Sequence, residues 1–468
     1  MSTAPSPNDT LVPPTYQIKF LIIGAGTFGL STALHLLQRG YKDVTVLDRA
    51  QELPAKDAAS TDINKIVRSS YADKFYTELA REAITEWHKH VWEGCYHACG
   101  TLSTGNEYMQ KAYDNDFQNG ANVALLPTAE SIRNAFPSSL HSDTDSGNDL
   151  IGDFTGYTGY FNNDGGWAEA ERAVSILFRL VRKEGGVVVP GKEVVDLLRN
   201  TSGCTEGVRC KDGTVYSADR VIVASGAWTA SAFPALELDK RCLATGQTVA
   251  TVQLTSEEAE QYRQCPVVLN FRTGFYVFPP TSDNIIKFAI HAAGHTHTVV
   301  SSATPVTPSD ASAASTSSST VPRKVSTPRT ILSHPTSSDG LRVPRSALAL
   351  LREHLRTVYP ALANMAWSGT RMCWYTDSPD GDWVIGPYPG DPGLFLATSG
   401  SGHAFKFLPN IGRLVADALE GKLDPAVAAR FAVDRDVSEA RNDERVSQVT
   451  QELDVDELCR AEDMIPSL

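Results

Sequence analysis

The sequence predicts a mixed α/β and α+β protein. We expect a Rossmann-like nucleotide-binding domain assembled from separate stretches of chain, with an antiparallel-sheet domain inserted between them. Three observations favour this class. A glycine-rich turn joins an apolar strand to a helix within residues 17–39. A second apolar strand, at 219–228, ends in Ser-Gly-Ala-Trp, and more widely spaced strands occupy residues 247–291.

The composition is typical of a folded acidic protein. The chain has 468 residues, of which 42% are hydrophobic and 21% charged, and its formal net charge is −13. This length corresponds to roughly two to three domains. A negative charge of this size gives no reason to expect binding to nucleic acid or to an anionic membrane. The eight cysteines show no CxxC spacing, so no metal site is predicted.

Neither end of the chain predicts a secretory or membrane destination. The first fifteen residues carry no basic, apolar leader. Glycines and a histidine interrupt the apolar stretch at 20–37. The C-terminal Pro-Ser-Leu matches a peroxisomal Ser-Lys-Leu signal only at its last residue. We therefore expect a cytoplasmic protein and leave a peroxisomal location open.

The first elements predict a β-α-β unit. Residues 17–23 form a short apolar run that ends at a glycine, as in a buried parallel strand. Residues 27–39 repeat apolar side chains at helical spacing, and Gly40 stands where a helix C-cap belongs. Residues 43–47 predict a second, parallel strand. Further strands are predicted at 186–189, 220–224, 247–254, 274–278 and 285–291, and an amphipathic helix at 167–182.

These elements predict a discontinuous domain organisation. The nucleotide-binding domain would comprise residues 16–104, 160–234 and 366–433, and the second domain residues 105–159 and 235–365. Residues 301–330 are predicted to be a low-complexity surface insertion, because Ser and Thr fill 12 of positions 301–322. A regulatory phosphorylation segment is the less favoured interpretation there. Residues 434–468 predict an acidic, peripheral helical tail.

A dinucleotide fingerprint follows the first strand. Gly24, Gly26 and Gly29 have GxGxxG spacing, and Asp48 ends the second strand. The glycines allow a tight turn, a close approach of the pyrophosphate to the backbone, and close packing of the helix on the strand. A carboxylate at position 48 suits ribose hydroxyls. Two further residues of the turn, Thr27 and Phe28, are expected to contact the cofactor, although the motif alone does not separate NAD from FAD.

The choice of FAD rests on the segment DRVIVASGAW at 219–228. It looks like the second FAD-contacting segment of flavoproteins of the glutathione-reductase type, which makes Ser225, Gly226 and Trp228 candidate cofactor contacts. An ordinary strand and turn is the alternative.

Several motifs in order carry a wider resemblance. The chain resembles the monomeric sarcosine oxidase group of FAD-dependent amine oxidases, of the D-amino acid oxidase type. This group includes fructosyl amino acid, pipecolate and saccharopine oxidases. The resemblance runs from about residue 16 to residue 430 and rests on DINKIVRSSYAD (62–73), GYFNNDGGWAEA (159–170), GFYVFPP and NIIKFAIH (274–291), RMCWYTDSPDGDWVIG (371–386) and SGSGHAFKFLPNIG (399–412).

The resemblance assigns a role to each candidate residue. It implies a covalent bond from the Cys373 sulfur to the flavin 8α-methyl group, with an inert buried cysteine as the alternative. It places Lys287 over the flavin to assist the reaction with oxygen. It makes Arg68 and Lys406 the cations that hold a substrate carboxylate. The other implied pocket or flavin positions are Tyr276, His291, Tyr375, Lys65 and Gly402.

One position separates branches of this group. Fructosyl amino acid oxidases typically carry Glu four residues after the flavin lysine, whereas this chain has His291. They also usually lack a tyrosine at position 375. Both differences disfavour Amadori compounds as substrates. His291 as a satisfied core histidine remains open.

The implied function is therefore FAD-dependent oxidation of a C–N bond in a secondary or N-methylated amino acid. The products would be an imine and hydrogen peroxide, with hydrolysis or ring closure of the imine left open. The chain also resembles tailoring oxidases of fungal alkaloid pathways, so a role in secondary metabolism is one expectation. The alternatives are a fructosyl amino acid oxidase, a flavin dehydrogenase with another acceptor, and a non-catalytic NAD-binding protein. The group tends to be monomeric.

Overall fold

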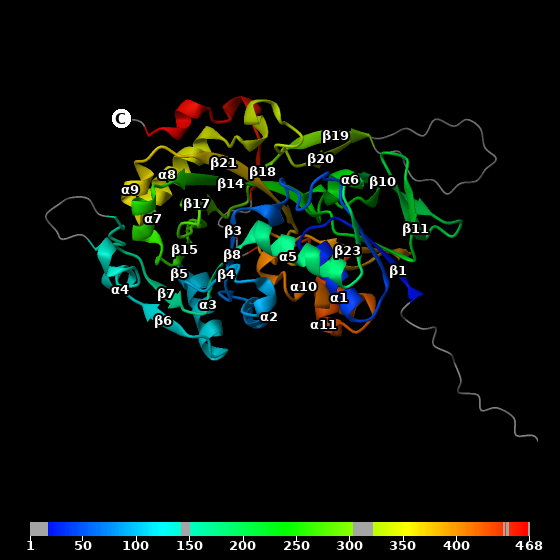
Figure 1. The fold of residues 1–468 in the computed structure, drawn as a ribbon, viewed down its shortest axis with the longest axis horizontal. Helices are drawn as coiled ribbons and strands as arrows, with labels where there is room; N and C mark the ends of the chain where they lie inside the picture. Colours follow the sequence, from blue (N-terminus) through cyan, green and yellow to red (C-terminus); the bar gives the residue numbers. More distant parts are fainter. Residues whose placement is uncertain (1–16, 142–149, 303–321, 443–444, 446–448, 467–468) are drawn as a thin grey trace, which may run out of the picture.

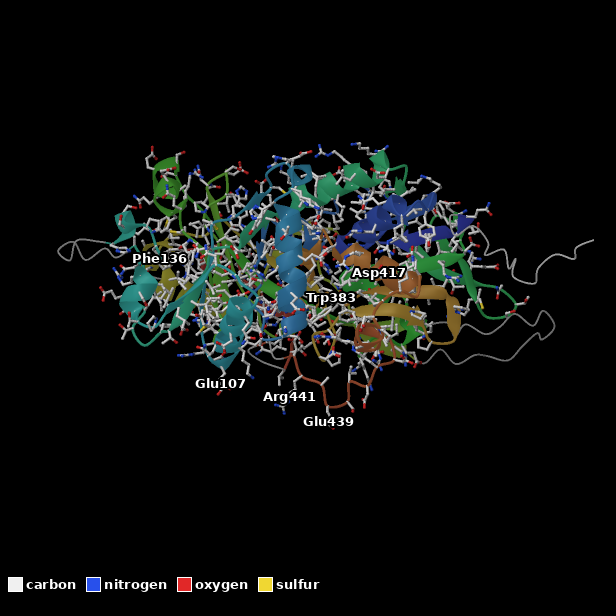
Figure 2. The ribbon with its side chains drawn as sticks, turned by 90° about the horizontal axis from the view of Figure 1, so that it is seen from below. Glu107, Phe136, Trp383, Asp417, Glu439 and Arg441 are labelled. Carbon is white, nitrogen blue, oxygen red and sulfur yellow. The ribbon has the colours of Figure 1, made fainter. Side chains whose placement is uncertain are left out.

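The computed structural model describes residues 17–141, 150–302, 322–442, 445 and 449–466. Figure 1 shows two sheet-centred halves along the long axis of the molecule, with β1 (Lys19–Ile23) in one and α8 (Arg345–Val358) in the other. The buried side chains form separate clusters in each half. In Figure 2, Phe136 marks the core of one half, and Trp383 lies nearer the middle of the molecule.

The first half is built on a six-stranded sheet. Its order is β22-β23-β13-β1-β2-β9, parallel except for the edge strand β22. The strands are β1, β2 (Asp43–Leu47), β9 (Val187–Val189), β13 (Arg220–Val223), β22 (Val384–Tyr388) and β23 (Asp391–Thr398). β1 is central, with Leu21 and Ile22 fully buried. This arrangement confirms the predicted Rossmann-like fold, assembled from distant stretches of chain.

Helices cover this sheet. They are α1 (Thr27–Gln38), α2 (Lys74–Trp87), α5 (Ala170–Lys183), α10 (Ile411–Leu419) and α11 (Pro425–Phe431). α1 packs against α5 and α10. The contact with α10 is close enough that a Cβ on Gly412 would lie 2.1 Å from the Ser31 carbonyl oxygen. Two small sheets flank this half: β3 (Asn64–Val67), β8 (Gly166–Glu169) and β4 (Tyr96–His97); and β10 (Val194–Arg199), β11 (Thr205–Cys210) and β12 (Val215–Ser217).

The helix predicted at 167–182 begins later than expected. Gly166–Glu169 form β8, which pairs with β3, and the helix α5 starts at Ala170. Its pairing partner β3 lies about a hundred residues earlier in the sequence, so the amphipathic pattern of 167–182 could not indicate this strand.

The second half is built on a large, mostly antiparallel sheet, which confirms the inserted domain type. Its main path is β24-β18-β14-β17-β16-β15-β5-β7-β6, and β21 pairs with β14. The strands are β5 (Thr101–Thr104), β6 (Val123–Leu126), β7 (Gly159–Asn162), β14 (Leu243–Gln253), β15 (Val267–Asn270), β16 (Phe275–Val277), β17 (Ile285–Ile290), β18 (His295–Thr296), β21 (Gly369–Asp377) and β24 (Gln451–Glu452). Its helices are α3 (Glu107–Gln118), α4 (Ala129–Arg133), α7 (Ser256–Tyr262), α8 and α9 (Pro360–Ala363), and α6 (Thr229–Ala232) follows β13.

The alternation of strand side chains gives this sheet two different faces. Phe288 and Trp374 point into the core beneath α8, whereas their neighbours Lys287, Cys373 and Tyr375 point to the opposite face. The period of two therefore places candidate site residues of β17 and β21 on one side of the sheet.

The insertion and the tail differ from expectation. Within 301–330, residues 303–321 lie outside the described part, while β19 (Thr298–Ser302) and β20 (Pro322–Ser326) pair as a hairpin, and Arg329 and Thr330 are buried. The tail is not a peripheral helix: β24 pairs with β18, and Leu458 and Cys459 are buried. Apolar side chains in this acidic segment dock it onto the second half. Among the helices that the structure describes, none is long and apolar enough to cross a bilayer.

Candidate active site

A cavity of about 570 Å³ lies where the six-stranded sheet meets the second half. It is lined by most of the residues predicted to contact a cofactor: Gly24, Gly26, Thr27, Phe28, Asp48, Lys65, Ser225, Gly226, Trp228 and Gly402. Gly29 has a packing role instead, because a Cβ there would lie 1.8 Å from the Gly24 carbonyl oxygen.

The fingerprint turn is shaped for a bound phosphate. Gly24 has a φ of +112°, and a Cβ on it would lie 2.4 Å from the Ala224 carbonyl oxygen. At Gly26 the nearest atom to an added Cβ is Ser60 Oγ, at 3.5 Å, so the backbone at the start of α1 is open to the cavity. Free N–H groups at a helix N-terminus attract anions. These features fit the pyrophosphate of a dinucleotide.

Asp48 and its neighbours form one wall of this cavity. The Asp48 carboxylate accepts hydrogen bonds from the backbone N–H groups of Ala25 at 2.8 Å and Ala50 at 2.9 Å. Burial raises its pKa. Arg49, which sequence reasoning missed, lies with its guanidinium carbon 3.9 Å from the centre of the Trp228 ring. The wall thus offers a carboxylate for hydroxyl groups and a flat cationic surface.

A second, smaller cavity of about 70 Å³ adjoins the first. Lys65, Tyr375, Gly402 and Phe405 line both. The small cavity also brings together four predicted site residues from distant parts of the chain: Arg68, Tyr276, His291 and Lys406. The structure therefore groups the two predicted carboxylate-binding cations with the predicted aromatic and histidine residues.

A hydrogen-bonded chain fixes Lys406. Its Nζ donates to Tyr71 Oη at 2.6 Å and to the His403 carbonyl oxygen at 3.0 Å. Tyr71 Oη lies 3.1 Å from His403 Nδ1, and His403 Nε2 lies 3.0 Å from the Gly381 carbonyl oxygen. Because a carbonyl oxygen only accepts, Nε2 carries a proton and Nδ1 accepts from Tyr71 in the neutral imidazole. The Tyr71 ring also lies 4.7 Å from the Arg68 guanidinium carbon.

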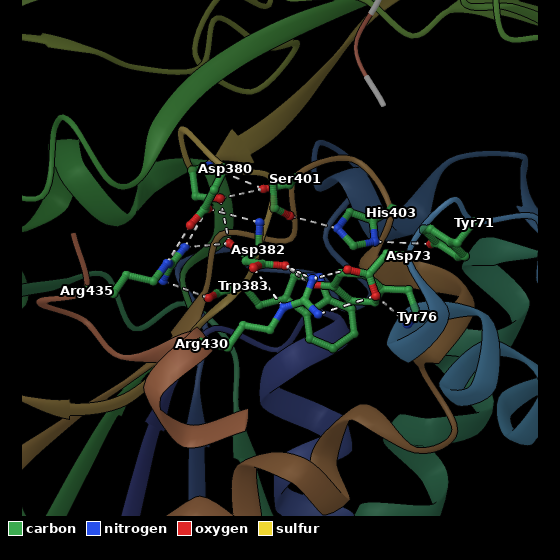
Figure 3. Close-up of polar contacts among 12 residues, drawn as sticks. Tyr71, Asp73, Tyr76, Asp380, Asp382, Trp383, Ser401, His403, Arg430 and Arg435 are labelled. Atoms are coloured by element: carbon green, nitrogen blue, oxygen red, sulfur yellow. Dashed lines mark hydrogen bonds and ion pairs between the residues drawn. The ribbon is translucent and has the colours of Figure 1, made fainter. Parts of the chain in front are cut away.

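Tyr76 connects this chain to a group of ion pairs, since its ring centre lies 5.4 Å from that of Tyr71 and 4.8 Å from that of His403. The guanidinium carbon of Arg430 lies 4.8 Å from the Tyr76 ring centre, and Arg430 bridges Asp73 at 2.9 Å and Asp382 at 2.6 Å (Figure 3). Tyr71 and His403 were not identified from the sequence, because single aromatic residues in these motifs carry no distinguishing pattern.

A buried carboxylate, Asp62, pairs with two lysines. Its Oδ2 lies 2.7 Å from Lys287 Nζ and 3.0 Å from Lys65 Nζ. Lys287 is fully buried and also donates to the Asn64 carbonyl oxygen at 2.6 Å. Burial lowers the pKa of Lys287 to about 8. Although burial opposes it, Lys287 and Lys65 hold the pKa of Asp62 well below its usual range.

Cys373 and Lys287 lie behind the cavity walls rather than on them. Neither lines the large or the small cavity, whereas the next residues after Cys373, Trp374 and Tyr375, line the large one. Lys65 lines both cavities and also contacts Cys373, since its Nζ lies 3.4 Å from Cys373 Sγ. The side-chain amide of Asn64 is buried without a hydrogen-bond partner among the described residues.

His291 is held neutral in the small cavity. Burial lowers its pKa well below the usual value, and the nearby charges of Arg445 and Arg68 lower it further. Its ring centre lies 6.1 Å from that of Tyr375. No described atom makes a hydrogen bond to its Nε2, so this nitrogen is buried and unpartnered. A bound ligand would be its natural partner.

Comparisons with known proteins find relatives along most of the chain. The L-saccharopine oxidase of Schizosaccharomyces pombe is 32% identical, covering 86% of this chain and 90% of that protein. The amino acid oxidase fsqB of Aspergillus fumigatus is 27% identical, covering 90% and 96%. Among solved structures, a modified fructosyl peptide oxidase from Aspergillus nidulans has a TM-score of 0.80 at 27% identity, covering 94% of this chain and 98% of that chain.

The match also extends to a whole family. The family described as FAD dependent oxidoreductase matches residues 19–418. This span contains the fingerprint turn, both cavities and all of the predicted site residues. The chain therefore belongs to the FAD dependent oxidoreductase family.

Proposed function

We propose that this enzyme oxidises the C–N bond of a secondary or N-methylated amino acid. The amine and O₂ would give an imine and hydrogen peroxide. The observation that carries the proposal is the small cavity, where two cations and a neutral, unpartnered histidine face a space that shares a wall with the cofactor cavity. Relatives named for L-saccharopine and N-methyl-L-tryptophan support an amino acid substrate.

FAD fits the large cavity. The open backbone at Gly26 and the N-terminus of α1 would hold the pyrophosphate, and Asp48 would accept hydrogen bonds from ribose hydroxyls. When bound, FAD supplies the two-electron oxidant for the C–H bond beside the amine nitrogen. We further propose that Cys373 holds the flavin through a thioether. Support comes from its surroundings: the next two residues, Trp374 and Tyr375, line the large cavity, and the Nζ of Lys65, which also lines it, lies 3.4 Å from the Cys373 sulfur.

The small cavity would bind and orient the substrate. Arg68 offers a planar fork for a carboxylate, and Lys406 adds a point charge that Tyr71 holds in place. With the carboxylate fixed, the amine would lie toward His291. A neutral imidazole can accept a hydrogen bond from the N–H of a neutral amine. The cations around His291 disfavour a second positive charge there, so the site favours the neutral amine, which has the lone pair that imine formation requires.

Lys287 would serve the reaction with oxygen. Negative charge develops on O₂ as it is reduced, and a fixed cation in a dry site stabilises that charge. The fully buried ammonium of Lys287 is anchored by Asp62 and by the Asn64 carbonyl oxygen. We propose that this charge favours O₂ over other electron acceptors.

A fructosyl amino acid oxidase is the second candidate, since solved structures of fructosyl peptide oxidases share this fold. His291 argues against it, because fructosyl amino acid oxidases typically carry Glu at this position.

Anaerobic bleaching of the flavin absorption band tests the proposal. The panel contains sarcosine, N-methyl aromatic amino acids, pipecolate, saccharopine and fructosyl-lysine. We expect bleaching by an N-alkylated or cyclic amino acid, followed by rapid recovery in air. Bleaching by fructosyl-lysine alone would support the second candidate. Slow recovery in air would indicate a dehydrogenase, and a colourless protein would refute flavin chemistry altogether.

A further inference from the structure

Arg445, in the C-terminal segment, lies behind the wall of the small cavity. Its side chain is only 4% exposed, and its guanidinium carbon is 5.3 Å from the centre of the Tyr375 ring. Nη2 lies 2.5 Å from Asp377 Oδ1, and Nη1 donates to the Ala292 carbonyl oxygen. The family match ends at residue 418, so this arginine lies beyond the region that defines the family.

The two partners of Arg445 stand at the ends of different strands. Ala292 directly follows His291 just beyond β17, and Asp377 is the last residue of β21, two positions after Tyr375. Within the described part of the chain, β17 and β21 each pair with β14 and not with each other. The guanidinium therefore bridges, across β14, the ends of two strands that are not paired with each other.

We propose that Arg445 is a positioning residue for the active site, which fastens the ends of β17 and β21 together and so holds His291 and Tyr375 at their places in the small cavity. The inference deepens the proposed function, because both of those residues line the cavity to which we assign substrate binding. Arg445 thereby becomes a part of the active site although it lies beyond the matched family region.

The charge of Arg445 has a second effect. The groups that face His291 are the cations Arg445, Arg68 and Lys406, the imidazole of His403, and Tyr375. Substitution of Arg445 by Met removes one cation and the ion-pair partner of Asp377, which keeps the hydrogen bond that Thr245 Oγ1 donates to it. If Asp377 stays ionised, the surroundings of His291 lose one positive charge. If Asp377 takes up a proton, the ion pair is replaced by two neutral groups, but Arg445 is the charge that lowers the pKa of His291 most, so we expect this pKa to rise in both cases, and less in the second.

A set of three variants separates these effects. Arg445→Met removes both the charge and the link between strands, whereas Arg445→Lys keeps the charge but loses the planar fork. Arg342→Met is the matched control. Arg342 holds the same C-terminal segment through the Cys459 carbonyl oxygen at 2.6 Å and the Leu458 carbonyl oxygen at 2.7 Å, and it does not line the small cavity.

The first readout is a pH titration of the visible flavin spectrum in ligand-free holoenzyme, in which the acid midpoint that His291→Asn abolishes is assigned to His291. We expect its acid midpoint to rise in Arg445→Met by at least about half a pH unit. The midpoint should stay within about 0.2 units of the wild type in Arg445→Lys and Arg342→Met. An unchanged midpoint in folded Arg445→Met, or an equal shift in Arg342→Met, would overturn the charge effect.

The second readout is the dissociation constant of the amine that bleaches the wild-type flavin. We expect it to increase about fivefold or more in both Arg445 variants, because both lose the link between strands. Unchanged affinity in both would overturn the positioning role. If no amine in the panel bleaches the flavin, the proposed function fails, but the spectral titration still decides whether Arg445 acts on His291.

Discussion

Lys287 allows the oxygen reaction to be tested apart from substrate oxidation. In Lys287→Met the buried cation is lost, while Asp62 keeps its second partner, Lys65, at 3.0 Å. A unit charge about 4 to 8 Å from a developing anion contributes on the order of 2 to 4 kcal/mol at an effective dielectric constant of about 20. At about 1.36 kcal/mol per factor of ten, this predicts reoxidation that is about 30 to 1000 times slower.

The assay is stopped-flow spectroscopy of the two half-reactions. The rate of anaerobic flavin reduction should change by less than about threefold in Lys287→Met, while reoxidation by air-saturated buffer should show the full loss. Lys406→Met is the matched control, since it also removes a buried lysine, but one that lines the small cavity. It should impair reduction and leave reoxidation nearly unchanged. Equal losses in both half-reactions of Lys287→Met would refute the assigned role.

The pH dependence supplies an independent check. Burial lowers the pKa of Lys287 to about 8, so the ammonium is present below pH 8 and is lost as the pH rises through that value. Wild-type reoxidation should therefore be fast and flat on the acid side and should fall above about pH 8. In Lys287→Met this fall should disappear. If the reoxidation rate of the variant still falls above about pH 8, the fall belongs to the titration of another group.

Three further predictions concern other parts of the molecule. Tyr71→Phe removes the hydroxyl that accepts from Lys406, which should raise the substrate dissociation constant about tenfold in anaerobic titrations; unchanged affinity would remove Tyr71 from the site. Cys373→Ala should release its flavin into the supernatant on acid precipitation, whereas the wild type should keep its flavin on the protein; release from both would exclude the thioether. Gly412→Ala places a Cβ within 2.1 Å of the Ser31 carbonyl oxygen. It should lower the free energy of unfolding, measured in urea melts, by about 2 kcal/mol or more. An unchanged free energy of unfolding would mean that α1 and α10 can move apart at little cost.

Local patterns predicted the fold well where sequence neighbours determine the structure. The turn at Gly24 and Gly26 needs only the strand before it and the helix after it, so its spacing indicated both the elements and the phosphate site. The strand β8 was missed because its hydrogen-bond partners, in β3, lie about a hundred residues earlier. Propensity alone could not choose strand over helix for Trp167.

The candidate site was predictable only in part, for the same reason. The resemblance identified Arg68, Lys406 and His291, and the structure groups them in one cavity. It did not identify Asp62 or Arg445, because an acidic residue in a polar motif and an arginine in an acidic tail have no local signature. Their importance arises from burial beside charges distant in the sequence, which only the folded chain reveals.

The strand order of the six-stranded sheet has a consequence for how the enzyme is made. Gly24 and Gly402 line the same cavity, and β22 and β23 come from the last quarter of the chain. During synthesis the fingerprint turn leaves the ribosome long before the residues that close the cavity around it. The large cavity is thus complete only late in synthesis, and a chain interrupted before β22 has the fingerprint turn but lacks the Gly402 side of the cavity.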